Sequence, residues 1–339
     1  MGEAERGAFE VEAASDVADQ AQALALPLTP GEAPEPSATD EIAQPGEVVR
    51  TAGRPSFGKT VLAIVVFLAL VALIWEGFKW LAGDPWYLPA IGYTHTPPFH
   101  LLQASDLQLP HLWDIAAALA QPVQRGADET LGQFLIGAGF FTWREAVVGF
   151  ALGAFIGILL ASVFVHSRLT ERAFLPYVIA SQTIPIVALA PLIVVGFGRG
   201  LVAVVFIAVY LTFFPVTIAE ARGLRSPDPR ALELMRSYAA SRWSILWKVR
   251  FPASVPYLFT ALKVAATASV VGAIIGEDPA GIGDGLGRAI VNFNEQYITG
   301  PEKLWATIIV AAMVGVFFYL LVSLAERLVL RRRVAGAAA

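Results

Sequence analysis

The chain has 339 residues, of which 56% are hydrophobic and only 15% are charged. A soluble globular protein carries about 25% charged residues, so this composition excludes an ordinary soluble domain and indicates a membrane protein. The absence of cysteine excludes a disulfide scaffold, a thiol nucleophile and a cysteine-ligated metal centre. The net charge of −4 is an average over two unlike parts of the chain.

The first of these parts is an acidic N-terminal segment. Residues 1–50 contain eleven acidic and two basic residues, and they are rich in Ala, Pro and Gln. Such a segment buries too little apolar surface to offset the entropy that ordering costs. We therefore expect residues 1–55 to form a disordered acidic tail in the cytoplasm, with a regulatory or docking tail as the alternative.

Six stretches are long enough to span a bilayer, which needs about 20 mostly apolar residues. They are Thr60–Ala82, Ala146–Val165, Phe174–Phe197, Leu201–Ala219, Tyr257–Gly276 and Leu304–Leu324. Glu76 and Lys79 stand near one end of the first stretch, where both can reach the membrane interface. Lys263 stands inside the fifth, and its long side chain can extend outwards. The sequence thus predicts an all-α membrane protein with six transmembrane helices.

The distribution of Lys and Arg predicts the orientation of these helices, because cytoplasmic loops carry an excess of both. They gather before the first stretch, between the second and third, between the fourth and fifth, and in the C-terminal tail. We therefore expect a multi-pass protein of the bacterial plasma membrane with both termini in the cytoplasm. Its expected parts are the acidic tail, a first helix with an extracytoplasmic segment at 56–141, a core at 142–330 with a cytoplasmic loop at 220–255, and a basic tail at 331–339.

Two patterns suggest chemistry but have simpler explanations. Residues 53–60 fit the Walker A pattern, but a polar tail precedes them and a membrane helix follows, whereas that motif needs an α/β sheet to present the phosphate loop. Three of the four histidines lie in one extracytoplasmic loop, yet none is paired at the spacing of metal ligands. We expect no catalytic residue, no metal site, no cofactor and no nucleic-acid partner.

Small residues inside the apolar stretches indicate close helix packing, and polar residues there are candidates for lining a translocation path. Gly149, Gly153 and Gly157 form two overlapping GxxxG units, which let another helix approach closely. The partner helix could belong to the same subunit or to another. Polar residues in the third and fourth stretches either bond neighbouring helices or line a wet path. The candidates for a translocation path are Ser181, Gln182, Thr183, Tyr210 and Thr212.

The loop between the fourth and fifth stretches is the most informative segment. Asp228, followed by proline, is typical of a helix start. Leu232, Met235 and Ala239 fall on one helical face, and small residues separate them from a second short helix at 242–249. We expect two short helices that lie against the membrane surface and present an apolar face and several bases. Such a surface suits docking of a soluble partner, and a plain interfacial element is the alternative.

Residues 233–256 also carry a resemblance to a known family. They resemble the "EAA" loop of binding-protein-dependent ABC-transporter permeases, whose pattern is Glu-Ala-Ala, three residues, Gly, then Ile and Leu-Pro. Three residues match this pattern: Glu233, Ile245 and Pro252. Leu234 and Met235 stand in place of the two alanines, and Ala239, Ala240 and Ser241 form a run of small residues at the position of the glycine. Ala239 stands where the family has glycine, which makes a sharp left-handed turn harder to adopt. The likeness extends from about Trp143 to Arg327 and is nearest to the nitrate, sulfonate and taurine branch, which also includes permeases for thiamine precursors and riboflavin.

The resemblance implies a permease of the type I ABC importer fold. Two permease subunits, identical in the simplest case, would assemble with two cytoplasmic ATPases and an extracytoplasmic binding protein. Residues 233–241 would form the coupling helix, and the 228–250 loop would transmit ATP-driven movement to the membrane helices. The permease itself would carry out no covalent chemistry.

Two questions stay open at the level of sequence. A secondary transporter without an ATPase partner is the alternative from another class, but it needs coupling-ion carboxylates inside the spans, and we expect only Glu76 and Glu277, both near span ends. The third and fourth stretches contain no Lys or Arg. This is compatible with an uncharged heterocyclic substrate, although an oxyanion stays open.

Overall fold

The computed structural model describes residues 57–88, 92–124 and 126–337. The expected acidic tail at 1–55 lies outside the described residues. From Val66 onward the chain forms one compact unit, and the packing below is that of this unit.

The described chain is mainly helical, with one pair of short antiparallel strands in which Trp86 lies opposite His95. The first elements are α2 (Phe57–Ala82), β1 (Trp86–Leu88), β2 (Tyr93–His95), the 3₁₀ turn η1 (Leu102–Ala104), α3 (Leu112–Ala118), α4 (Leu131–His166), α5 (Arg168–Ser181) and α6 (Ile186–Phe197). The remainder are α7 (Leu201–Gly223), α8 (Pro229–Ser237), α9 (Arg242–Ile245), a π-helical turn (Leu246–Arg250), α10 (Phe251–Glu277), α11 (Leu286–Glu295), the 3₁₀ turn η3 (Tyr297–Thr299) and α12 (Pro301–Ala337).

Five helical segments of the described chain are long and apolar enough to cross a membrane. They are Val65–Ala82, Leu131–His166, Leu201–Gly223, Arg242–Glu277 and Pro301–Arg331. The third stretch of the sequence prediction is different, because α5 and α6 meet at an angle of 104° and count as one span only as a bent pair. Pro185 explains the break, since a proline lacks the backbone N–H and disfavours helical geometry in the residue before it. The third predicted stretch is therefore two helices with a bend between them, and the described chain has six spans if this bent pair is counted as one.

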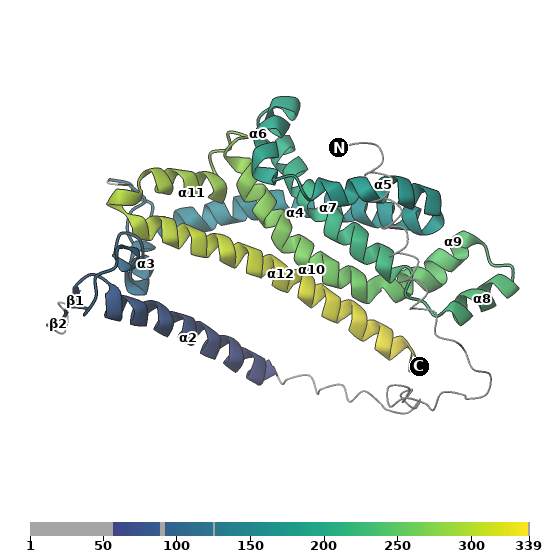
Figure 1. The fold of residues 1–339 in the computed structure, drawn as a ribbon, viewed down its shortest axis with the longest axis horizontal. Coiled ribbons are helices and arrows are strands. Elements are labelled where there is room, and N and C mark those ends of the chain that lie inside the picture. Colours follow the sequence, from purple (N-terminus) through teal and green to yellow (C-terminus); the bar gives the residue numbers. More distant parts are fainter. Residues whose placement is uncertain (1–56, 89–91, 125, 338–339) are drawn as a thin grey trace, which may run out of the picture. The chain divides into compact units, whose positions relative to one another are not determined.

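The core of the bundle consists of α4, α7 and α10, with α7 running alongside α10 in Figure 1. The three α4 glycines of the GxxxG units all face α7. A methyl group at Gly153 would lie 2.6 Å from Cβ of Thr212, and Gly149 lies directly against Ala208. From the other side, a methyl group at Gly272 of α10 would lie 2.8 Å from Cα of Ala208. The partner of the GxxxG units is thus α7 of the same chain.

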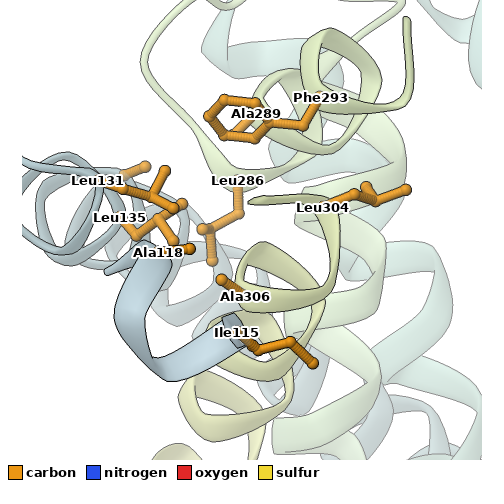
Figure 2. Packing of buried hydrophobic residues seen from close by; sticks show 10 residues of the cluster. Ile115, Ala118, Leu131, Leu135, Leu286, Ala289, Phe293, Leu304 and Ala306 are labelled. Carbon is orange, nitrogen blue, oxygen red and sulfur yellow. The ribbon is translucent and has the colours of Figure 1, made fainter. Parts of the chain in front are cut away.

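A second hydrophobic cluster joins α3, α11 and the first turns of α4 and α12. Leu286 at the start of α11 is fully buried at its centre, and Figure 2 shows the side chains of Leu131, Leu135 and Ala306 close to it. Trp75 of α2 packs against this cluster and meets Trp305 edge-on at 5.0 Å between ring centroids. The short helices are therefore held to the long ones by apolar packing.

Two charged side chains near the end of α2 hold the segment that follows it. Nζ of Lys79 donates hydrogen bonds of 2.5 Å to Oδ1 of Asp106 and 2.5 Å to the carbonyl of Leu109, and the Lys79 side chain is fully buried. Glu76 accepts a 2.7 Å hydrogen bond from Nδ1 of His111. Acceptors on the α2–α3 segment therefore enclose the ammonium group of Lys79 in the last turn of α2.

The cation inside the fifth stretch is also paired. Nζ of Lys263 on α10 donates to Oε2 of Glu326 on α12 at 2.9 Å, and each side chain is about four-fifths buried. An ammonium group inside a membrane protein is stabilised by a buried carboxylate partner. Lys263 thus has a partner on α12, because α12 continues as a helix beyond its apolar run and brings Glu326 into reach.

Candidate functional site: a projecting loop and a broken span

The segment from Leu224 to Arg250, which we call the α8–α9 loop, leaves the bundle at the end of α7 and returns at the start of α10. Its first helix begins as the sequence predicts. Asp228 is the N-cap of α8, its Oδ1 accepts a 2.8 Å hydrogen bond from the Arg230 amide, and Pro229 occupies the first helical position. A side-chain acceptor followed by proline satisfies or removes the free N–H groups of a helix start.

The end of α8 is a left-handed turn at Ala239, whose φ is +52°. The Ala239 amide donates to the carbonyl of Arg236 at 2.9 Å, and the Ala240 amide donates to the carbonyl of Met235 at 3.0 Å. These two bonds are those of a Schellman motif, in which glycine is the usual left-handed residue. Within the described residues, Ala239 alone among non-glycine residues has a positive φ. The turn that the family makes with glycine is therefore made here with alanine.

From this turn the chain continues to α10 through the short helix α9 and a pair of buried side chains. Ser241 is the N-cap of α9, with its Oγ accepting from the Ser244 amide at 3.2 Å. Ile245 and Leu246 are buried, and Leu246 packs with Leu224 and with Ala161 of α4. α9 then runs through the π-helical turn into α10, so the second predicted helix, 242–249, is the beginning of a longer one. Pro252 lies in the first turn of α10.

α8 itself has no buried residue, and Figure 1 shows it projecting beyond the end of α10. Leu234 and Tyr238 are 59% and 78% exposed, and Glu233 is exposed beside them. Met235 is half-buried. The loop also presents several basic side chains, Arg225, Arg230, Arg236, Arg242 and Lys248. The resulting surface is an apolar patch among positive charges on an otherwise unsupported helix.

The break between α5 and α6 is the second feature with uncommon geometry. Four residues, Gln182 to Pro185, separate the two helices, and all four are exposed. The last carbonyl groups of α5 are nevertheless bonded. Oγ of Ser181 donates to Val178 at 2.7 Å, the Gln182 amide to Ile179 at 3.1 Å, Oγ1 of Thr183 to Ala180 at 2.8 Å, and the Tyr210 hydroxyl to Ser181. The C-terminal carbonyl groups of α5 are thus satisfied by hydrogen bonds, and α6 begins as a separate helix. Its N-cap residue, Pro185, makes no side-chain capping bond.

The five candidates for a translocation path separate into two places. Ser181, Gln182 and Thr183 form the break, and Tyr210 reaches it from α7. Thr212 is instead fully buried against Gly153 in the contact between α4 and α7. Its position therefore fits helix packing better than a path, although the role of each residue stays a prediction.

Three carboxyl groups of the long helices are buried, and the sequence prediction places only one of them, Glu277, near a span. Glu145 of α4, Glu220 of α7 and Glu277 of α10 are each no more than 1% exposed. The expectation that only Glu76 and Glu277 stand within or near the spans is therefore wrong. Its cause is that α4 and α7 extend beyond their charge-free runs, so that residues placed in loops by hydropathy are inside the bundle.

Glu277 has an identifiable structural task. Oε1 accepts from Oγ1 of Thr142 at 2.5 Å, and Oε2 accepts from the Gly287 amide at 2.5 Å. A carboxylate at a helix N-terminus satisfies free N–H groups and the helix dipole, so Glu277 fixes the start of α11 to α10 and α4. Gly285 and Gly287 leave the room that this carboxylate occupies.

These features together define a polytopic helical membrane protein in which a projecting loop joins two core helices. Residues 153–334 match the family of binding-protein-dependent transport system inner membrane components, which is more than half of the chain. The chain therefore belongs to this family, and it is a multi-pass membrane protein of the ABC importer permease class. The resemblance seen in the α8–α9 loop is confirmed.

Individual relatives fall in the branch that the sequence suggests. The chain is 33% identical to the formylaminopyrimidine transport permease protein ThiX of Halalkalibacterium halodurans over 196 residues, which is 56% of this chain and 77% of the relative. It is 35% identical to the riboflavin transport system permease protein RibX of Chloroflexus aurantiacus, over 49% of this chain and 61% of the relative. The solved MetNI methionine ABC transporter is similar with a TM-score of 0.46 and 17% identity, over 65% of this chain and 98% of that one.

Proposed function

We propose that this chain is the membrane subunit of an ATP-driven importer, and that its α8–α9 loop couples the membrane helices to a cytoplasmic ATPase. The observation that carries the proposal is α8, a capped helix with an uncovered apolar patch, closed by the strained turn at Ala239. A positive φ at a residue other than glycine costs free energy, and such strain occurs mainly at functional sites, where a particular backbone conformation is required. Residues 228–250 would thus form a rigid docking element that fits a groove in the partner.

The basic side chains of the loop support its placement in the cytoplasm. With this orientation, both chain ends lie in the cytoplasm of a bacterium and the α11 end of the bundle faces an extracytoplasmic binding protein. The protein then carries out no bond-making chemistry. ATP hydrolysis takes place on the partner, and a displacement of α8 changes the access of the path from one side of the membrane to the other.

We place the path beside the break between α5 and α6. Ser181, Gln182 and Thr183 form the break, and Tyr210 joins it to the core. Irregular backbone at membrane depth is tolerated where protein or a water-filled cavity covers it. A second copy of this chain, facing the first across the exposed break, would supply that cover. The importer would then contain a permease homodimer.

For the substrate we propose an uncharged heterocycle. The residues of 174–197 and 201–219 include no Lys or Arg to pair with an oxyanion. The relatives named for formylaminopyrimidine and riboflavin transport are 33% and 35% identical to this chain. The relatives named for aliphatic sulfonate transport in Bacillus subtilis and nitrate import in Leptolyngbya laminosa are 28% identical.

The first experiment is purification of the tagged protein from its native membranes in mild detergent, followed by mass spectrometry of what accompanies it. The proposal expects an ABC ATPase and a binding protein, and a pyrimidine or flavin bound to the latter. Absence of an ATPase, even after cross-linking through residues 228–250, would overturn the proposal. A secondary transporter that uses Glu145 or Glu277 would then be the better explanation, and the protein alone in liposomes would show transport driven by an ion gradient.

A further inference from the structure

The two ends of the α8–α9 loop are joined by a buried carboxyl group. Glu220, one turn before the end of α7, is fully buried, and its Oε1 accepts a 2.6 Å hydrogen bond from Oγ of Ser254 on α10. Ser254 is also fully buried. Oε2 of Glu220 has no hydrogen-bond partner among the described residues. The group is therefore held at one oxygen only, by a serine from the helix on the far side of the loop.

Two further contacts join the same places. Gly223 allows the helices to touch, since a methyl group there would lie 2.8 Å from Cβ of Ser254 and 2.9 Å from Cβ of Tyr257. One residue further on, the carbonyl of Leu224 accepts a 3.1 Å hydrogen bond from the Arg250 guanidinium group. The chain thus leaves the bundle and re-enters it at one junction, which we call the loop base.

The Glu220–Ser254 contact is a poor means of gaining stability. A buried polar group with an unsatisfied atom destabilises the folded state, and a well-packed apolar side chain at the same position would avoid that cost. Its geometry is nevertheless specific: Oγ of Ser254 also lies 3.2 Å from the carbonyl of Phe251 in its own helix, but its 2.6 Å bond to Glu220 is the shorter one and joins the two helices. A contact of this kind fixes the distance and register of the two helices that it joins.

We propose that Glu220 is a positioning residue, which with Ser254 keeps the ends of α7 and α10 together so that a displacement of α8 moves both helices as one body. That the displacement comes from an ATPase rests on the function proposed above. The joining of the two helices does not, so the two ideas can be tested separately.

The first test uses the chain alone in lipid nanodiscs and measures amide hydrogen exchange over residues 220–256. Glu220→Ala and Ser254→Ala each remove the hydrogen bond, and we expect exchange in this segment to rise about tenfold for either variant, since loss of a local contact lowers the free energy of local opening. Glu220→Gln keeps an acceptor for Ser254 and should behave like the natural chain. The matched control is Ser269→Ala, because Ser269 is fully buried in the same helix but donates only to Ala266 of its own helix.

The second test replaces the hydrogen bond by a covalent one. The chain contains no cysteine, so the pair Glu220→Cys and Ser254→Cys supplies the only thiols of this subunit. It is oxidised in the complex with the copurified ATPase and binding protein, and the natural chain in the same complex is the control for oxidation of the partners. In the reduced state we expect the stimulation of ATP hydrolysis by the binding protein to fall severalfold. A disulfide that locks the loop base should restore it, because the helices move together throughout the cycle.

Each outcome decides the question. Restored stimulation after oxidation, with raised exchange in the two alanine variants, supports the proposal. Exchange equal to that of the Ser269→Ala control, or stimulation lost on oxidation and present on reduction, overturns it, because the helices would then be independent or would have to separate. If no ATPase accompanies the natural chain, the proposed function fails, and the exchange experiment still decides whether Glu220 positions the loop base.

Discussion

The hydroxyl group of Tyr210 donates a hydrogen bond to the carbonyl oxygen of Ser181. Tyr210 belongs to α7, which contacts the glycines of α4 and α10, whereas Ser181 ends α5 at the broken span. One side chain therefore connects the tightly packed core with the irregular part of the membrane domain. A change in the position of α7 reaches the break directly through this contact.

We expect Tyr210→Phe to loosen the break without unfolding the bundle. The substitution keeps the ring but leaves the Ser181 carbonyl without its donor, which costs about 1–3 kcal/mol where the group is shielded from water. Hydrogen exchange of residues 178–186 should therefore increase by about tenfold or more. Unchanged exchange in this segment would show that the hydroxyl group does not hold the break. Thr217→Val, which removes a hydroxyl bonded within α7 itself, is the control.

Ala239→Gly should stabilise the α8–α9 loop. Ala239 has a φ of +52°, a conformation that costs an L-residue with a Cβ about 1 kcal/mol relative to glycine. Protection of α8 against hydrogen exchange should increase by about fivefold. Ala240→Gly, where no left-handed conformation is needed, should reduce it. Equal effects of the two substitutions would contradict the assignment of strain to Ala239.

Gly153→Leu should disrupt the contact of α4 with α7. Even a methyl group at this position would lie 2.6 Å from Cβ of Thr212, so a larger side chain must force the helices apart, at a cost of about 1–3 kcal/mol or more. The matched control is Gly137→Leu in the same helix, where a methyl group meets nothing within 4 Å. Thermal unfolding in detergent should show a lower transition temperature for the first variant. Equal transition temperatures would rule out this contact as the purpose of the GxxxG units.

The Lys263–Glu326 pair predicts a compensating double substitution. Lys263→Met leaves Glu326 as a buried unpaired charge and should destabilise the protein by about 3–5 kcal/mol. Adding Glu326→Leu removes that charge and should recover most of the loss. A double-substitution cycle by chemical unfolding in mixed micelles measures the coupling. Additive effects would show that the two groups do not interact within the membrane.

Local signals in the sequence predict much of the fold and of the loop. The apolar runs identify the helices, Asp228 before a proline identifies the start of α8, and the glycine spacing from Gly149 to Gly157 identifies a packing face. Each of these depends on residues within one or two turns of one another. The EAA-like pattern likewise locates the left-handed turn at Ala239, although alanine there gives no sign of a positive φ by itself.

The remaining features depend on which residues meet across the bundle. Lys263 and Glu326 are far apart in sequence, and hydropathy places Glu326 at the end of a helix. Glu220 similarly lies just outside an apolar run, so its burial against Ser254 follows only from the length of α7 and the small Gly223 after it. The bend at Pro185 has a local cause, but a proline inside an apolar run also occurs in continuous helices, as at Pro191 in α6 and Pro215 in α7.

The most direct test of the account is the effect of Ala239→Glu on ATPase association. The substitution places a negative charge in the turn that ends α8, next to the exposed Tyr238. The control Ile298→Glu places one at an 83% exposed position beside α11, away from the loop. Tagged variants are purified from membranes, and the ATPase that accompanies them is quantified by mass spectrometry. The account predicts normal membrane insertion for both, loss of the ATPase from Ala239→Glu and its retention by Ile298→Glu. Full retention of ATPase by Ala239→Glu, with ATP-dependent uptake like that of the natural chain, would contradict it.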